Sequence, residues 1–218
     1  MNRPILGGFV GGALALALLA TVGARAGVVA FPLDRPEGPA LWLASRAAGI
    51  TAYLALTLDV VFGLFLSSSM ADGWIARARS VEVHRWLSSV VLTLTAAHAI
   101  ALLGDRVVRF DLLDVLVPFL APYRPFAVGL GVVAAYAAVV LHGSFALRSR
   151  LGPRVWRALH HLSFALYALA TAHGLTAGSD AHLPWLRALH LASVGIVLPL
   201  TAHRVLAGWT RRRAAPPG

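Results

Sequence analysis

The sequence predicts an all-α membrane protein, a bundle of six transmembrane helices, and two observations lead to this prediction. Of the 218 residues, 58% are hydrophobic and 13% are charged, whereas an ordinary soluble domain carries about 25% charged residues. The mean hydropathy is +0.74, and the apolar residues occur in blocks long enough to cross the hydrocarbon core of a bilayer. We therefore expect a multi-pass protein in contact with the lipid bilayer, built as a single domain over residues 1–218.

Six apolar blocks are separated by short polar connections, and each block is expected to form one span. The predicted spans are residues 5–30, 41–68, 84–103, 126–147, 156–177 and 185–208. The first block has a small-residue site at Ala24-Arg25-Ala26, as a signal peptide would. Its apolar run is longer than that of a signal peptide, so we expect it to be retained as a helix.

The fourth apolar block extends over residues 115–147 and starts with a proline-rich stretch. Pro118, Pro122 and Pro125 fall in its first third, and proline interrupts a helix interior because it lacks the amide hydrogen and clashes with the preceding turn. Residues 115–125 are therefore expected to form an interfacial or re-entrant segment, with the helix itself over 126–147.

The distribution of arginine orients the bundle. With the N-terminus inside, the inner segments carry twelve arginines and two acidic residues, and the outer segments carry seven arginines and six acidic residues. Because positively charged loops stay in the cytoplasm, we expect both termini to be cytoplasmic. The formal net charge of +10 is then explained by insertion and by anionic lipid, and no nucleic-acid partner is predicted.

Four histidines form two pairs, His84 with His98 on the third span and His160 with His173 on the fifth. An imidazole inside hydrocarbon is costly unless it is bound. At about 1.5 Å per residue, spacings of fourteen and thirteen residues cover roughly 21 and 20 Å, so the two spans offer ligands at two matching depths. Cysteine is absent, which excludes iron–sulfur clusters and thiolate ligands. The pattern favours two b-type haems between the third and fifth helices, bound by His84 with His160 and by His98 with His173.

Helical geometry leaves one ligand open. Around a straight helix, His84 and His98, fourteen residues apart, point in directions that differ by about 40°. The directions of His160 and His173, thirteen residues apart, differ by about 140°, and those of His161 and His173, twelve apart, by about 120°. The fifth span is therefore expected to be kinked or locally rewound, or the haems to be rotated relative to each other, and geometry alone does not choose between His160 and His161. The remaining histidines of the spans and loops are interpreted as hydrogen-bonded side chains: His142, His182, His190 and His203.

These segments resemble the ferric reductase-like transmembrane domain family, which includes the membrane part of NADPH oxidases and ferric reductases. The resemblance is carried by Val83-His84-Arg85-Trp86, Ala97-His98, the stretch from Trp156 to Leu162, and His173-Gly174. The family's W-R-x-L-H-x-L signature falls on 156–162 and selects His160. The resemblance implies six helices and two b-type haems between the third and fifth, in a stand-alone bacterial protein of the plasma membrane.

The resemblance also gives candidate roles to three arginines. Arg46, near the outer end of the second span, is expected to meet a propionate of the outer haem, with snorkelling to the interface as the alternative. Arg85 and Arg157 flank the inner ligands and could meet inner propionates or serve as positive-inside anchors. Asp59, the acidic residue inside a span, could pair with an arginine or accept a hydrogen bond from an inner histidine.

The function implied is transmembrane electron transfer from a cytoplasmic-side donor to an external acceptor, as an oxidoreductase component. No FAD or NADPH is expected to bind this chain itself, so the donor would be a separate flavoprotein reductase or quinone, and the acceptor could be a periplasmic protein. The oxidase branch has a second outer histidine where this chain has Leu102, which argues against a dedicated superoxide generator. The alternatives are an MsrQ-like haem subunit that feeds a periplasmic reductase, and a haem-free transporter or scaffold.

Overall fold

A computed structural model describes residues 40–68, 77–105 and 108–214, and within these ranges the chain forms helices and no strand. The helices are α2 (Ala40–Ser68), α3 (Arg77–Leu103), α4 (Leu112–Leu116), α5 (Pro125–Ala146), α6 (Arg148–His160), α7 (Leu162–Ala177) and α8 (Pro184–Ala214). The predicted all-α class is confirmed. The first predicted span, 5–30, lies outside the described residues.

Four of these helices are long and apolar enough to cross a membrane. They are 40–68, 79–103, 125–146 and 184–210, with 22 to 29 residues each, and even 22 residues extend about 33 Å against a hydrocarbon core of about 30 Å. They correspond to the predicted second, third, fourth and sixth spans. Helix α3 begins at Arg77, seven residues before the predicted boundary, because its polar first turns remain helical beyond the apolar block that marks a span in the sequence.

The predicted fifth span is made of two helices, α6 and α7, which meet at His161. The amide of His161 lies 3.3 Å from the carbonyl of Arg157 and 3.2 Å from that of Ala158, so the chain tightens there before α7 begins. Helix α6 itself is kinked at Gly152, whose φ of 73° is in the left-handed region. The break between α6 and α7 agrees with the expectation that the fifth span is kinked or locally rewound. The count of six spans stays a prediction.

The segment before α5 is irregular, in line with its prolines. The short helix α4 is followed by turns in which Phe119 and Arg124 have φ values of 68° and 42°. Pro125 then opens α5, a position that suits proline because the first amides of a helix have no partner within it.

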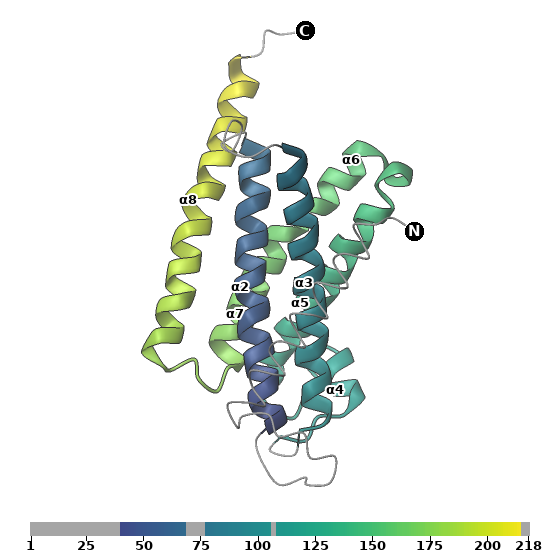
Figure 1. The fold of residues 1–218 in the computed structure, drawn as a ribbon, viewed down its shortest axis with the longest axis vertical. Coiled ribbons are helices and arrows are strands. Elements are labelled where there is room, and N and C mark those ends of the chain that lie inside the picture. Colours follow the sequence, from purple (N-terminus) through teal and green to yellow (C-terminus); the bar gives the residue numbers. More distant parts are fainter. Residues whose placement is uncertain (1–39, 69–76, 106–107, 215–218) are drawn as a thin grey trace.

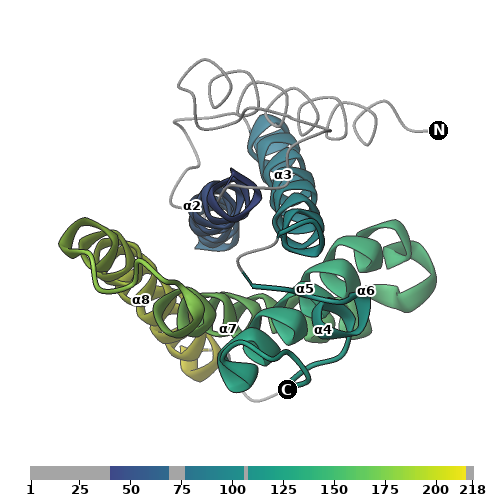
Figure 2. The same ribbon diagram turned by 90° about the horizontal axis from the view of Figure 1, so that it is seen from below.

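The helices form two layers, which Figures 1 and 2 show from the side and from below. One layer is the antiparallel pair of α2 and α3, and the other contains α8, α7 and α5, with α6 beyond. Apolar side chains from both layers form a buried core between them: Leu56, Leu64, Val91, Leu94, Leu166 and Val197. This arrangement brings one face of α3 opposite α6 and α7.

Candidate functional site

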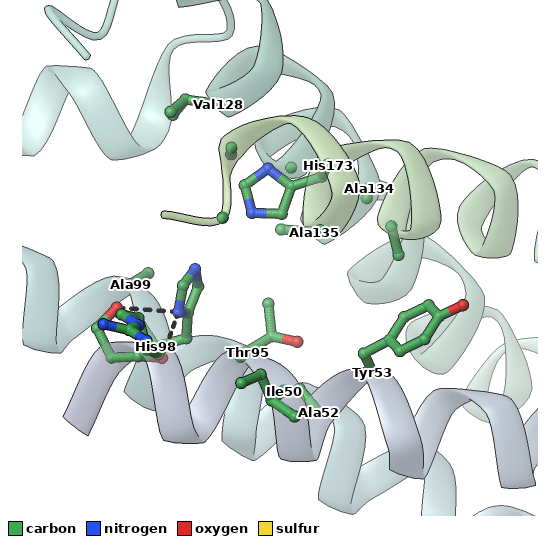
Figure 3. Close-up of a pocket in the computed structure, with 18 of the residues that line it drawn as sticks. Ile50, Ala52, Tyr53, Thr95, His98, Ala99, Val128, Ala134, Ala135 and His173 are labelled. Carbon is green, nitrogen blue, oxygen red and sulfur yellow. Dashed lines mark hydrogen bonds between the residues drawn. The ribbon is translucent and has the colours of Figure 1, made fainter. Parts of the chain in front are cut away.

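His98 on α3 and His173 on α7 face each other across the gap between the layers (Figure 3). Their ring centroids are 6.1 Å apart and the ring planes are inclined by 77°. Nδ1 of His98 lies 2.7 Å from the carbonyl oxygen of Ser45, and Nδ1 of His173 lies 2.9 Å from that of Ala127. A carbonyl can only accept, so each Nδ1 carries the hydrogen and each Nε2 keeps a free lone pair.

A cavity lies between these two rings. Its volume is about 230 Å³, whereas a single water molecule needs roughly 10–15 Å³. Side chains from α2, α3, α5, α7 and α8 line it, most of them apolar, and Tyr53 lies further along it from His98 (Figure 3). The space is therefore large enough for an organic group, and the imidazoles of His98, His173 and His190 line it.

His84 on α3 and His160 at the end of α6 form a second pair with almost the same geometry. Their ring centroids are 6.1 Å apart and the planes are inclined by 82°. Nδ1 of His84 lies 3.1 Å from the carbonyl oxygen of Asp59 and 2.8 Å from its carboxylate. His160 stacks on Trp156, with centroids 5.0 Å apart and an angle of 18°.

The neighbouring His161 has different surroundings. It is exposed, and its Nδ1 donates to the carbonyl of Arg157 at 2.5 Å within its own turn. Its ring lies 6.5 Å from that of Phe164. The structure thus brings His160, and not His161, opposite His84.

In both pairs the ring separation would allow the two imidazoles to hold one metal ion. An imidazole nitrogen binds a metal at about 2.0–2.1 Å and the ring centre lies about 1 Å behind it, so two rings sharing one ion have centres about 6 Å apart. The observed separations are 6.1 Å. No group of three or more metal-binding side chains occurs in the described part of the chain. Each pair would therefore offer two imidazoles to a metal whose remaining ligands come from another group.

The model of the ferric reductase like transmembrane component matches residues 47–171, more than half of the chain. The chain belongs to this family. It is therefore a membrane protein of a transmembrane oxidoreductase type. No curated protein and no solved structure matches the chain.

The matched region of this ferric reductase-like chain contains three of the four paired histidines. His84, His98 and His160 fall within it, while Arg46 lies just before it and His173 just after it. The structure nevertheless places His173 opposite His98 in the same way as His160 lies opposite His84. The geometry thus extends the paired arrangement beyond the matched segment.

The three predicted arginines lie in different surroundings. The guanidinium of Arg46 is paired with the carboxylate of Asp180, and both line the cavity at His98. The guanidinium of Arg85 lies over the ring of Phe145, 4.4 Å from its centre, and Arg157 is exposed. Of the three arginines, Arg46 is therefore the one placed directly at the cavity.

Several contacts of the ferric reductase-like site do not follow from the sequence. His98 and His173 each donate from Nδ1 to a backbone carbonyl, of Ser45 and Ala127, which no residue type specifies. The hydroxyl of Ser45 also lies 2.9 Å from Nδ1 of His98. His190 is expected to be an ordinary hydrogen-bonded side chain, and its Nδ1 does bond the carbonyl of Leu186 at 2.8 Å. Its ring also stacks on Tyr53 at 4.6 Å and lines the cavity, which its spacing in the sequence does not indicate.

Proposed function

We propose that this chain carries electrons across the membrane through two b-type haems, from a cytoplasmic-side donor to an external acceptor. The observation that carries the proposal is the pair of opposed histidine sets, each with a 6.1 Å separation of ring centroids. Bound haem supplies one-electron iron chemistry, and the protein supplies its ligands and surroundings.

The residues divide the work between two levels. His84 and His160 hold the inner haem, and His98 and His173 hold the outer one. The carbonyls of Asp59, Ser45 and Ala127 keep the hydrogen of three rings on Nδ1, which leaves Nε2 free to bind iron. Spacings of thirteen and fourteen residues put the two levels roughly 20 Å apart.

Positive side chains near each level suit the haem propionates. Arg46 lies at the outer cavity, where Asp180 balances its charge, and a propionate there would share the guanidinium with Asp180. At the inner level Arg85 and Arg157 flank the ligands in sequence, and we assign them to inner propionates. Arginine suits this role because its planar fork binds carboxylates with two hydrogen bonds.

The end of the bundle with α6 is assigned to the cytoplasm. Helix α6 carries Arg148, Arg150, Arg154 and Arg157, and positively charged segments stay on the cytoplasmic side. The arrangement proposed is thus a six-span protein of the bacterial plasma membrane with both termini inside. Its donor is a separate flavoprotein reductase or quinone, and its acceptor an external molecule or periplasmic protein.

The test is a count of haem in the purified protein. A pyridine haemochrome assay is expected to give about two haems b per chain, with a Soret shift and an α band on reduction by dithionite, because each histidine pair holds one iron. A colourless preparation from haem-replete cells would contradict the proposal and favour a haem-free scaffold.

Asp59→Asn is expected to raise the midpoint potential of the inner haem and leave that of the outer haem unchanged. The carboxylate of Asp59 lies 2.8 Å from Nδ1 of His84, and a negative charge beside a ligating histidine makes the ligand more basic, which favours the oxidised iron. The shift should be on the order of 50 mV, since a tenfold change in a one-electron equilibrium is about 59 mV. Spectroelectrochemical titration of both haems measures it.

The matched control for Asp59→Asn is Glu82→Gln. Glu82 is exposed and lies two residues before His84, so the same charge is removed at the same end of the bundle without touching the ring. We expect both potentials to stay at their wild-type values. An equal shift in the two variants would show that the general loss of charge, and not the carboxylate next to the ring of His84, sets the potential.

A further inference from the structure

Three of the four paired histidines lie against a glycine of a neighbouring helix. A Cβ added to Gly131 on α5 would lie 2.6 Å from Nδ1 of His173, and one added to Gly49 on α2 would lie 3.0 Å from Nδ1 of His98. A Cβ added to Gly63, also on α2, would lie 3.3 Å from Cε1 of His84. A side chain at Gly131 would therefore force the ring of His173 or its neighbours to shift, and one at Gly49 or Gly63 would make an unusually tight contact with the ring.

The same three rings are bonded to a carbonyl four residues before the glycine. His98 donates to Ser45, whose carbonyl precedes Gly49 by four positions, and His173 donates to Ala127, four before Gly131. In a helix, residues four apart lie on one face, so the carbonyl group and the glycine, which has no side chain, together form a small recess on the helix surface. The carbonyl has a second lone pair besides the one used within the helix, and the ring uses it.

The inner ring on α3 follows the same rule. His84 donates to the carbonyl of Asp59, which precedes Gly63 by four residues. The two glycines of α2 are fourteen residues apart, as are His84 and His98 on the antiparallel α3. The two helices are therefore in register over both levels of the site.

We propose that Gly49, Gly63 and Gly131 are positioning residues for haem ligation, an inference that rests on the function proposed above. Each forms, with the carbonyl four residues before it, a seat that sets the depth, the tautomer and the ring rotation of one ligating histidine. The seats hold His98, His84 and His173 respectively. A ring bonded through Nδ1 cannot rotate freely, so the seats fix both rings of the outer pair, whose planes are inclined by 77°, and one ring of the inner pair, whose planes are inclined by 82°.

His160 is held differently, which makes the inner level asymmetric. His160 and His173 are thirteen residues apart, so a matching glycine for His160 would be expected thirteen residues from Gly131 on α5. That position is Ser144, and a Cβ added to the adjacent Gly143 meets nothing within 4 Å. Trp156 stacks on the ring of His160 instead. The seat is thus a feature of three ligands, and the fourth depends on its own helix.

Alanine substitutions test the seats, because alanine is a better helix former than glycine and would be favourable where nothing opposes it. In Gly131→Ala the ring of His173 must move away from Ala127, and we expect outer-haem affinity to fall about 10–100-fold, the usual cost of losing a contact that orients a ligand. Gly49→Ala should have a smaller effect on the same haem, and Gly63→Ala the smallest, confined to the inner haem. This order follows the clearances of 2.6, 3.0 and 3.3 Å.

The measurements are haem stoichiometry, the low-spin ferric EPR signals and the midpoint potentials of the full-length protein. Strongly inclined axial rings give a signal with large g anisotropy, so rotation of one ring should reduce the anisotropy of one haem only. Gly143→Ala on α5 and Gly195→Ala on α8 are the controls, because an added Cβ has open space at both positions. Both should keep the wild-type spectra and potentials.

A readout that does not depend on haem separates the two proposals. In protein labelled with ¹⁵N-histidine, NMR reports whether Nδ1 of His173 carries the hydrogen, with or without haem, and Gly131→Ala should change this signal. Wild-type haem content, EPR and NMR signals in Gly131→Ala would overturn the seat. A haem-free wild type would contradict the proposed function instead, and the NMR comparison would still decide whether the glycine positions the ring.

Discussion

Substitution of His98 or His173 by alanine is expected to remove about half of the bound haem and to leave the inner haem in place. The two levels are roughly 20 Å apart along the helices, and each has its own pair of histidines. Loss of one imidazole would leave the outer haem with one histidine to hold it, in a cavity of about 230 Å³ whose lining is mostly apolar. The haem-to-protein ratio should fall from about two to about one, as measured by pyridine haemochrome on purified protein.

The double variant His98→Ala with His173→Ala gives the sharper version of this result. Because both residues act on one haem, the second substitution should remove little more than the first, which is the non-additive behaviour of residues that form one unit. His182→Ala is the control, since His182 is exposed in the connection before α8 and bonds the carbonyl of Ser179. Loss of both haems in either single variant would contradict two independent sites.

The second large effect is expected at the inner level, where two adjacent histidines should behave differently. His160→Ala should remove the inner haem, because its ring is the one that lies 6.1 Å from that of His84. His161→Ala should leave the haem content near that of the wild type, because His161 is exposed and bonded within its own turn. Each variant is the control of the other, since both remove one imidazole at the junction of α6 and α7.

Reduced-minus-oxidised spectra and the EPR signals of the inner haem provide the measurement. A full equivalent of haem lost from His161→Ala, with His160→Ala unaffected, would show that the junction at His161 is turned differently in the membrane. Loss in both variants would instead indicate that the junction must remain intact for either ring to be placed.

The fold class is predictable from the sequence because a soluble domain of this size rarely contains several apolar blocks of twenty or more residues. The helix ends are less predictable. Helix α3 starts at Arg77, within a polar segment, and hydropathy marks where the apolar block begins but not where the helix begins. For the fifth predicted span, the sequence predicts a kink or a local change in helical twist, but not that the helix divides at His161. The spacing of His160 and His173 indicates that a straight helix cannot present both rings on one face, but it does not indicate where the helix is interrupted.

The site is predictable where it depends on side-chain type and not where it depends on the backbone. Depth matching pairs His84 with His160 and His98 with His173, and the structure brings these rings together. The carbonyls that bond these rings leave no mark in a sequence because every residue has one. The partner of Arg46 is a residue in the connection between α7 and α8, and how this connection folds back is not determined by local pattern.

A cluster of hydroxyl groups joins α2, in one layer of helices, to α7 and α8 in the other. The hydroxyl of Tyr53 on α2 lies 3.3 Å from that of Tyr167, 3.2 Å from that of Thr171 and 3.1 Å from that of Ser193. In lipid, apolar surfaces gain little from meeting each other, so polar contacts and close packing decide how helices associate. A single phenol of α2 therefore links α2 to both α7 and α8, and an insertion intermediate with α8 turned away would lose the contact to Ser193 in a lipid environment that offers no replacement.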